Sequence, residues 1–372
     1  MSKNRFIIKG LFVLSVFYVN SLIAAEAYTP IAYGVKSLGM GGVGIATLQG
    51  AESGMENPAL LSYLKNNELS LGVTATRYDQ DISNYPEIKM DYDPDYTYVP
   101  YMAVNYKLNE NFSMGLSVSQ FKIGNKVTYI TTDGNNTTGG IYSSIKKTRV
   151  VLPLSYKLNN LSFGISLVSE KEEYALHALE DDGMNQDFSS TDYGYMCGLA
   201  YQFPQENVLI ALNYKSRIKH EFYNSDEEHY FHLSSASELG VGVHWKINNT
   251  NSSLAVDYKR VKGSQVYSKS EPTTWYEDQD VFAIGYSYDV EKWSLRAGYR
   301  YVDSLYGYDL LSAWYPYDSK SHYTIGGTYF INRSFSTDVA LVYASYSRTM
   351  KENDADLNND STSLALSINY NF

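Results

Sequence analysis

Positively charged side chains recur two or four positions apart in stretches where apolar and polar residues alternate. Two such pairs are Lys215 with Arg217 and Arg296 with Arg300. In a β-strand, residues two or four apart point to the same face. Such cations can bind the carboxylate of an acidic ligand, or they can pair with carboxylates of the same chain, such as Glu52 and Glu56. Both interpretations stay open at the level of the sequence.

Other residue types that act in catalysis or hold metals do not combine into a site. A serine nucleophile needs a histidine and an orienting acid beside it, and no such set stands out, so we predict no enzyme activity and no cofactor. His220 and His232 flank a short predicted loop, but a metal clip needs three or four ligands. We interpret them as solvated residues at the rim and predict no metal site. Cys197, the single cysteine, is interpreted as an apolar strand residue.

The stretch from residue 34 to residue 64 is small, rich in glycine and nearly uncharged. Its distinctive residues are Gly39, Gly41, Gly42, Gly44, Asn57, Pro58 and Ala59. Glycine at this density costs conformational entropy in a free domain, so it indicates backbone packed closely inside another structure. Proline after asparagine marks a turn that starts a short helix. A phosphate loop is excluded, because no strand precedes the glycines and no Gly-Lys-Ser/Thr follows them.

Composition and the N-terminal residues indicate an exported, β-rich protein. The chain has 372 residues, 37 of them tyrosine, and a net charge of -11, which argues against a nucleic-acid partner. Residues 1–25 have the basic start and short apolar core of a secretory signal, with cleavage after Ala25 or Ala27. After this segment no apolar run is long enough for a membrane-spanning helix.

From Glu68 onward, apolar and polar residues alternate with a period of two, as in β-strands. Six short polar turns each follow an aromatic, any residue and an apolar residue. The aromatics are Tyr106, Tyr156, Tyr201, Trp245, Tyr288 and Tyr329. Aromatics at one height beside short turns, with long polar loops at the other end, are typical of an outer-membrane barrel.

We therefore predict an all-β fold: a transmembrane antiparallel barrel of about fourteen strands over residues 67–372, with a small N-terminal plug, residues 26–66, in its lumen. Fourteen is an even number, and a barrel of this size leaves a hole that side chains alone do not fill. Single strands are expected over residues 207–223 and 229–246. The last strand ends on Phe372, which we interpret as a signal to the barrel assembly machinery.

The glycine stretch, followed by Asn57-Pro58-Ala59, resembles the start of the FadL-like family of long-chain fatty acid and hydrocarbon transporters. The resemblance implies a signal peptide, an N-terminal hatch and a fourteen-stranded outer-membrane barrel. It also implies that a hydrophobic substrate passes to a site beside the hatch and leaves sideways near a kinked third strand. In this chain the third strand offers only Gly115 as a kink site.

The expected function is passive, hatch-gated transport of hydrophobic compounds, such as long-chain fatty acids or hydrocarbons, by a monomer in the outer membrane. Arg296, Arg300, Lys215 and Arg217 are the candidate substrate-binding residues. An acidic segment at residues 91–95 is expected to meet lipopolysaccharide through divalent ions. The alternative is a barrel without transport activity that acts in secretion or adhesion. A transporter predicts an apolar path leading to the hatch, whereas an interaction protein predicts a packed polar lumen.

Overall fold

The computed structural model describes residues 30–82, 88–92, 96–131, 137–178, 186–223, 229–266, 276–305, 319–349 and 356–372. The predicted signal segment and residues 26–29 and 93–95 lie outside these ranges. Among the described residues, no helix has the length and apolar character needed to cross a bilayer.

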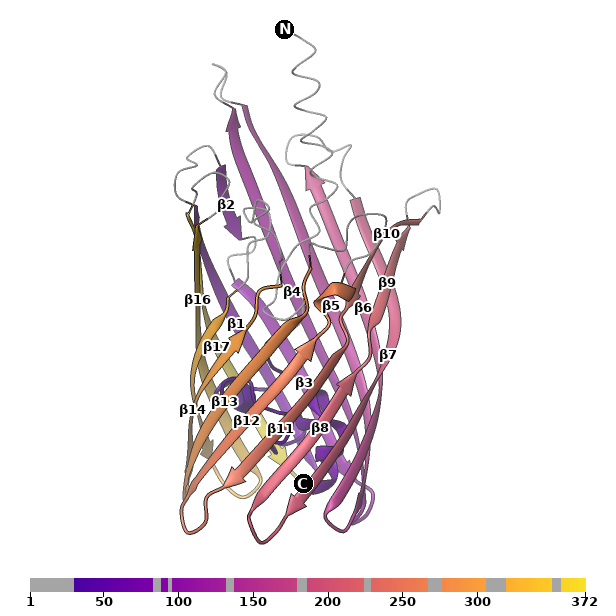
Figure 1. Cartoon of the computed structure of the whole chain (residues 1–372), viewed down its shortest axis with the longest axis vertical. Helices are drawn as coiled ribbons and strands as arrows, with labels where there is room; N and C mark the ends of the chain where they lie inside the picture. The colour runs from indigo at the N-terminus through magenta and orange to yellow at the C-terminus, as the bar shows by residue number, and fades with distance from the viewer. Residues whose placement is uncertain are drawn as a thin grey trace.

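Fourteen antiparallel strands form one closed ring, in which each strand pairs with its neighbours along the chain (Figure 1). The ring consists of β1 (Glu68–Ile82), β3 (Tyr96–Lys107), β4 (Phe112–Thr131), β5 (Thr137–Leu158), β6 (Leu161–Ala178), β7 (Gln186–Phe203), β8 (Val208–Lys215), β11 (Glu238–Lys246), β12 (Ser252–Val261), β13 (Gln279–Val290), β14 (Trp293–Val302), β15 (Ser321–Phe330), β16 (Phe335–Thr349) and β17 (Asp356–Asn371). Pairing of β1 with β17 joins the two ends of the sheet. The predicted barrel and its fourteen strands are confirmed.

Side chains alternate along these strands as the sequence predicts, with small polar groups inside and large apolar groups on the lipid side. The short turns lie together at one end of the barrel, the lower end in Figure 1. Three of them place an asparagine at positive φ: Asn159, Asn207 and Asn249. Asparagine tolerates this conformation better than most residues. Near the same end, aromatic rings touch across strands, for example Phe112 with Tyr156 at 4.7 Å between ring centroids.

Two of the predicted strands are interrupted, which corrects the expectation of continuous strands over 207–223 and 229–246. Beyond β8 the chain leaves the ring and forms a separate hairpin of β9 (Ile218–Tyr223) and β10 (His229–Ser235) before β11 begins. Phe222 and Leu233 of this hairpin are buried in an apolar cluster. Burying each such side chain contributes about 1.5–3 kcal/mol, which favours a hairpin that packs on other parts of the chain over one that extends freely. A short strand, β2 (Ile88–Tyr92), pairs with the outer half of β4.

Residues 30–64, which we call the inner segment, lie within the ring in its lower half (Figure 1). They contain only short helices: α2 (Val35–Leu38), α3 (Ser53–Glu56) and the 3-10 helix η1 (Pro58–Tyr63). A further 3-10 helix, η3 (Gly263–Gln265), follows β12. Helix α2 contacts β15, β16, β17 and β1, whereas η1 contacts β4 to β7 on another side of the ring. The inner segment therefore reaches across the lumen.

Candidate functional site

Asn57 connects the inner segment to the barrel wall through hydrogen bonds of its side chain. Its Oδ1 accepts a hydrogen bond from Ala59 N at 3.1 Å and so caps η1. Its Nδ2 donates to the carbonyls of Ile45 and Leu212, the second of which belongs to β8. A Cβ on Gly198 of β7 would lie 2.0 Å from Asn57 Oδ1. The asparagine therefore needs a glycine in the facing strand, a requirement that the motif at residues 57–59 does not reveal.

The predicted glycines mark where the inner segment meets the barrel. Gly41 and Gly42 have φ of 72° and 79°, a region that favours glycine. Gly41 N donates to Thr324 Oγ1 at 2.7 Å. Gly44 N and Ile45 N both donate to Asp257 Oδ2, at 2.7 and 2.9 Å. Backbone amides of the inner segment are thus bound by side chains of β15 and β12.

A buried ion-pair cluster holds α3 against β8 and β12. Glu56 lies 2.9 Å from Lys215 Nζ and 2.9 Å from Lys259 Nζ, and Lys215 also pairs with Glu238 at 3.0 Å. Burial by itself would raise the pKa of Glu56, but Lys215 and Lys259 lower this pKa to about 2. Glu56 is therefore ionised across the physiological range. The interpretation that lumen cations pair with the N-terminal segment is confirmed for Lys215 and Glu56.

Glu52 lies at the other end of α3, and its carboxylate has fewer stabilising contacts than that of Glu56. Both carboxylate oxygens of Glu52 are buried and accept no hydrogen bond. Burial, together with the nearby carboxylates of Glu68 and Asp338, raises the pKa of Glu52 to about 7 against the attraction of Lys36. Lys36 Nζ lies 3.7 Å from Glu68 and 3.9 Å from Asp338. This corner of the inner segment is therefore sensitive to protonation.

The four predicted substrate-binding cations do not converge on one site. Lys215 is in the Glu56 cluster, and Arg217 donates to Ser234 Oγ of β10 at 3.0 Å. Arg296 donates to Thr328 Oγ1 at 2.7 Å, next to Asp338 on the neighbouring strand. Arg300 is fully buried, and its guanidinium lies against Gly42 of the inner segment. Lys215 ends β8, Arg217 lies between β8 and β9, and both Arg296 and Arg300 lie on β14, so the four cations have different neighbours.

A cavity of about 70 Å³ lies between the inner segment and the wall formed by β1, β3, β4 and β15 to β17. Its lining combines apolar groups with hydroxyl groups and one imidazole: Pro30, Ile31, Ala32, Leu38, Thr74, Thr76, Tyr78, Val99, Phe121, His322, Val342, Ser361 and Ser363. No Asp, Glu, Lys or Arg is among the described residues that line it. The cavity is thus suited to an uncharged molecule.

Apolar side chains continue from this cavity into the outer half of the lumen. A buried cluster there joins Phe121 of β4, Tyr174 of β6, Phe222 of β9 and Val281 of β13 with residues of β5, β10, β12 and β14 and of the loops that follow β10, η3 and β14. Phe121 belongs to both the cluster and the cavity lining, and Tyr78 and Val99 of the lining pack against the cluster. Contacts between apolar side chains therefore extend from the outer lumen to the cavity beside the inner segment.

The wall itself is weakened next to η1. Pairing between β4 and β5 runs through Met114 with Leu154, is absent for the next two residues of each strand, and resumes in the same register at Ser117 with Val151. The unpaired positions include Gly115 opposite Pro153, which has no N–H to donate. A Cβ on Gly115 would lie 3.0 Å from the Pro153 ring and 3.2 Å from Leu61 of the inner segment. Gly115, the predicted kink site, thus lies at this gap.

A second hollow, of about 680 Å³, lies at the wall formed by β14 to β16. Exposed side chains such as Trp293, Leu295 and Leu341 line it, and Gly326 and Gly327 leave part of it without side chains. Outward-facing apolar residues dominate this lining, so it belongs to the lipid side of the barrel.

His220 corrects the interpretation of the histidines as solvated rim residues. Its side chain is fully buried, and it pairs across the hairpin with Leu233, so it does not face His232. Alternation along 218–222 carried the signal that this side chain faces inward. Its acidic neighbours come from β6 and β7, which no local pattern could identify. Cys197 is exposed on the outer face of β7, as predicted.

Comparison with known proteins agrees with this architecture. Residues 19–258, well over half of the chain, match the family described as outer membrane protein transport protein (OMPP1/FadL/TodX). Outer membrane protein P1 of Haemophilus influenzae is 24% identical in an alignment of 263 residues that covers 64% of this chain and 53% of that protein. The match therefore spans about half the length of this curated relative.

Solved structures show the same fold at low sequence identity. The toluene transporter TodX of Pseudomonas putida superposes with a TM-score of 0.71 at 18% identity, covering 92% of this chain and 99% of that one. The toluene transporter TbuX of Ralstonia pickettii gives a TM-score of 0.70 at 18% identity, covering 92% and 98%. A FadL homologue of Pseudomonas aeruginosa gives a TM-score of 0.70 at 14% identity, covering 94% and 100%. This chain belongs to the OMPP1/FadL/TodX family of outer-membrane proteins.

Proposed function

We propose that this protein carries small, uncharged hydrophobic compounds across the outer membrane. The observation that carries the proposal is the lining of the lumen cavity, in which the described residues offer apolar and hydroxyl groups and include no acidic or basic residue other than His322. Transfer of apolar surface from water into such a lining is favourable by about 25 cal/mol per Å². Passive transport down a concentration gradient then needs no cofactor.

The cavity chemistry favours hydrocarbons over fatty acids as substrates. A fatty-acid carboxylate needs a cation or several hydrogen-bond donors when it leaves water. Lys215, one of the cations that contact the inner segment, already pairs with Glu56 and Glu238. Relatives with this fold are named toluene transporters, which makes monoaromatic hydrocarbons the first compounds to test.

Movement of the inner segment is the proposed gate. The cavity of about 70 Å³ is smaller than a cavity of about 150 Å³ that holds benzene, so a substrate needs the inner segment to shift. Leu61 lies beside the gap between β4 and β5 at Gly115 and Pro153. A shift of η1 would expose this gap, and the substrate would leave sideways through it.

Uptake of radiolabelled toluene and palmitate by a deletion strain carrying each variant tests the proposal. Thr76→Asp places a carboxylate in the cavity, where no described lysine or arginine compensates it. We expect toluene uptake to fall at least about tenfold, because a buried unpaired charge costs several kcal/mol. Thr76→Val keeps the size of the side chain without the charge and serves as the matched control.

Normal toluene uptake by Thr76→Asp, in a barrel that assembles like the wild type, would overturn the cavity as the route. Palmitate uptake that exceeds toluene uptake would overturn the substrate class. A deletion strain that takes up both compounds as well as the wild type would favour the alternative role in secretion or adhesion.

A further inference from the structure

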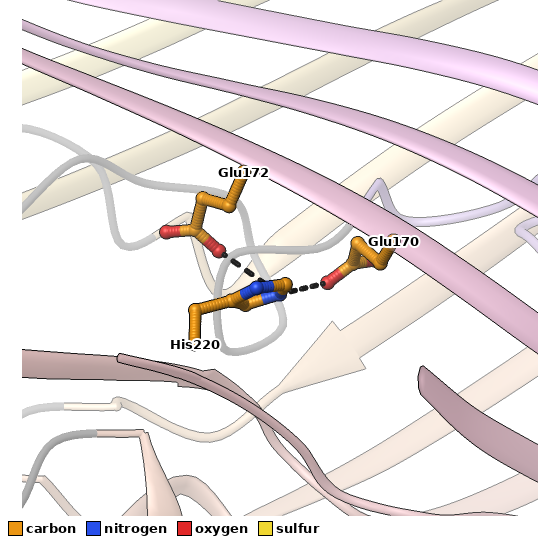
Figure 2. Close-up of side chains that lie close together, drawn as sticks. All are labelled: Glu170, Glu172 and His220. Atoms are coloured by element: carbon orange, nitrogen blue, oxygen red, sulfur yellow. Dashed lines mark hydrogen bonds and ion pairs between the residues drawn. The ribbon is translucent and has the colours of Figure 1, made fainter. Parts of the chain in front are cut away.

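A buried histidine on the β9–β10 hairpin points at two glutamates of β6 (Figure 2). His220 Nε2 lies 3.1 Å from Glu170 Oε1 and 3.6 Å from Glu172 Oε2. The three side chains are at most 1% exposed. One ligand atom from each lies within 4.8 Å of the other two. The hairpin and the barrel wall therefore bring three ligand groups to one point.

The contact made by the other imidazole nitrogen, Nδ1, determines whether Nε2 faces the two glutamates with a lone pair or with a proton. His220 Nδ1 lies 3.0 Å from Asp192 Oδ2 of β7. Because a carboxylate only accepts, Nδ1 donates to Asp192, and a neutral ring then turns the lone pair of Nε2 toward Glu170 and Glu172. A lone pair facing two carboxylates is repulsive unless a proton or a metal ion lies between them. In metal sites, the second nitrogen of a metal-binding imidazole often donates to a carboxylate, as Nδ1 of His220 does to Asp192.

The negative charges of the cluster outnumber its lysine and arginine side chains by one. Arg149 pairs with Glu170 Oε2 at 2.6 Å, and Glu170 Oε1 accepts a hydrogen bond from Ser235 Oγ and faces His220. Lys147 Nζ lies 3.2 Å from Glu172 Oε2, yet neither oxygen of Glu172 accepts a hydrogen bond. Three carboxylates (Glu170, Glu172 and Asp192) thus face two fixed cations, and one negative charge remains.

We propose that Glu170, Glu172 and His220 bind a divalent first-row transition metal ion such as Zn²⁺. Zinc binds imidazole nitrogen and carboxylate oxygen at about 2.0–2.2 Å, so tetrahedral ligands lie about 3.4 Å apart. The separations of 3.1 and 3.6 Å lie on either side of this value. One imidazole and two carboxylates suit zinc and its neighbours better than magnesium or calcium, which prefer oxygen ligands alone.

Such an ion joins parts of the chain that are far apart in the sequence. It connects the β9–β10 hairpin to β6 at the outer end of the lumen. Arg149, which pairs with Glu170, also donates to Tyr33 of the inner segment at 3.0 Å. The metal site thus lies at one end of a continuous set of contacts that runs from the hairpin to the inner segment.

Calorimetry of the purified full chain with Zn²⁺ alone, in detergent at pH 7.5, tests the proposal. We expect one bound ion per chain, and a loss of affinity of at least tenfold in His220→Gln. Asp192→Asn keeps all three ligands but weakens the support of the imidazole, and we expect a loss of about 10-fold to 100-fold. His177→Gln is the matched control, because His177 lies on β6 beside Asp187 but outside the cluster.

Two outcomes would overturn the metal site. One is the absence of zinc binding to the wild type, which would assign the point between the three groups to a proton. The other is zinc binding that His220→Gln leaves unchanged, whether or not His177→Gln alters it. Migration of unheated samples on a denaturing gel reports whether each variant forms the barrel, and Glu172→Gln replaces His220→Gln if the latter does not.

Discussion

The lower and outer halves of the lumen are filled by different chemistry. In the lower half, the inner segment meets the wall through ion pairs, backbone hydrogen bonds and glycine contacts, with Glu56 between Lys215 and Lys259 at the centre. In the outer half, the wall and the β9–β10 hairpin present an apolar cluster that includes Phe121 and Phe222. Directional, charged contacts hold a segment in one place, whereas apolar side chains make no such directional contacts. In the proposed function, the lower half is the seal, formed by the inner segment and its contacts with the wall, and the outer half is the path of the hydrophobic compound.

Glu56→Gln is the change expected to break the seal most strongly. Removing one partner of a buried ion pair costs about 3–5 kcal/mol. In this cluster Lys215 and Lys259 lose their shared partner, and Lys215 keeps its pairing with Glu238. We expect a lower urea midpoint and faster proteolysis of residues 30–64. Glu206→Gln, at an exposed short turn, is the control. Equal proteolysis of both variants would show that the ion pairs do not hold the inner segment.

The stability of the folded chain should depend on pH through the protonation of Glu52 in the inner segment. The folded chain, in which the pKa of Glu52 is about 7, binds this proton more tightly than the unfolded chain, with its ordinary pKa of 4.5. The free energy of unfolding therefore falls as the pH rises from 4.5 to about 7, by up to about 3 kcal/mol. Urea unfolding at pH 5 and pH 8 should show this loss in the wild type and a smaller loss in Glu52→Gln. Identical pH dependence in both would contradict the prediction.

A methyl group in the wall should also disturb the seal. A Cβ on Gly298 of β14 would lie 2.2 Å from the backbone of Met40 and Gly41. Overpacking of this kind costs about 1–3 kcal/mol, so Gly298→Ala should displace the inner segment and raise sugar permeability in liposome swelling. Gly327→Ala adds the same methyl group on the neighbouring strand, where the nearest atom is 3.3 Å away. Equal permeability in the two variants would place the seal elsewhere.

Arg217→Gln is the mildest change and sharpens the role of the outer half. Arg217 is half-buried and donates to Ser234 of the hairpin, so its loss should cost about 1 kcal/mol. If the outer half is a path for uncharged molecules, toluene uptake in the radiolabel assay stays within about twofold of the wild type. A loss of palmitate uptake alone would instead identify Arg217 as a carboxylate ligand.

Much of the barrel could be predicted because its signals are local. Alternation with a period of two marks each strand and assigns every side chain to lipid or lumen, as for Cys197 and Asp257. The hairpin at 218–235 is not predicted as a separate element because its residues alternate like those of the strands beside it. Only the packing of Phe222 and Leu233 against other strands distinguishes it.

The candidate sites depend on information of longer range. Local patterns in the chain are enough to place Lys215, Arg296 and Arg300 on the inward face and to show that residues 34–64 are built for close packing. The partner that each inward charge meets emerges only in the folded barrel, since Lys215 and Glu56 are 159 positions apart. The meeting of His220 with Glu170 and Glu172 likewise depends on the fold. Strand alternation sets only the face of a side chain, whereas ring closure and the register of fourteen strands set its height and its neighbours.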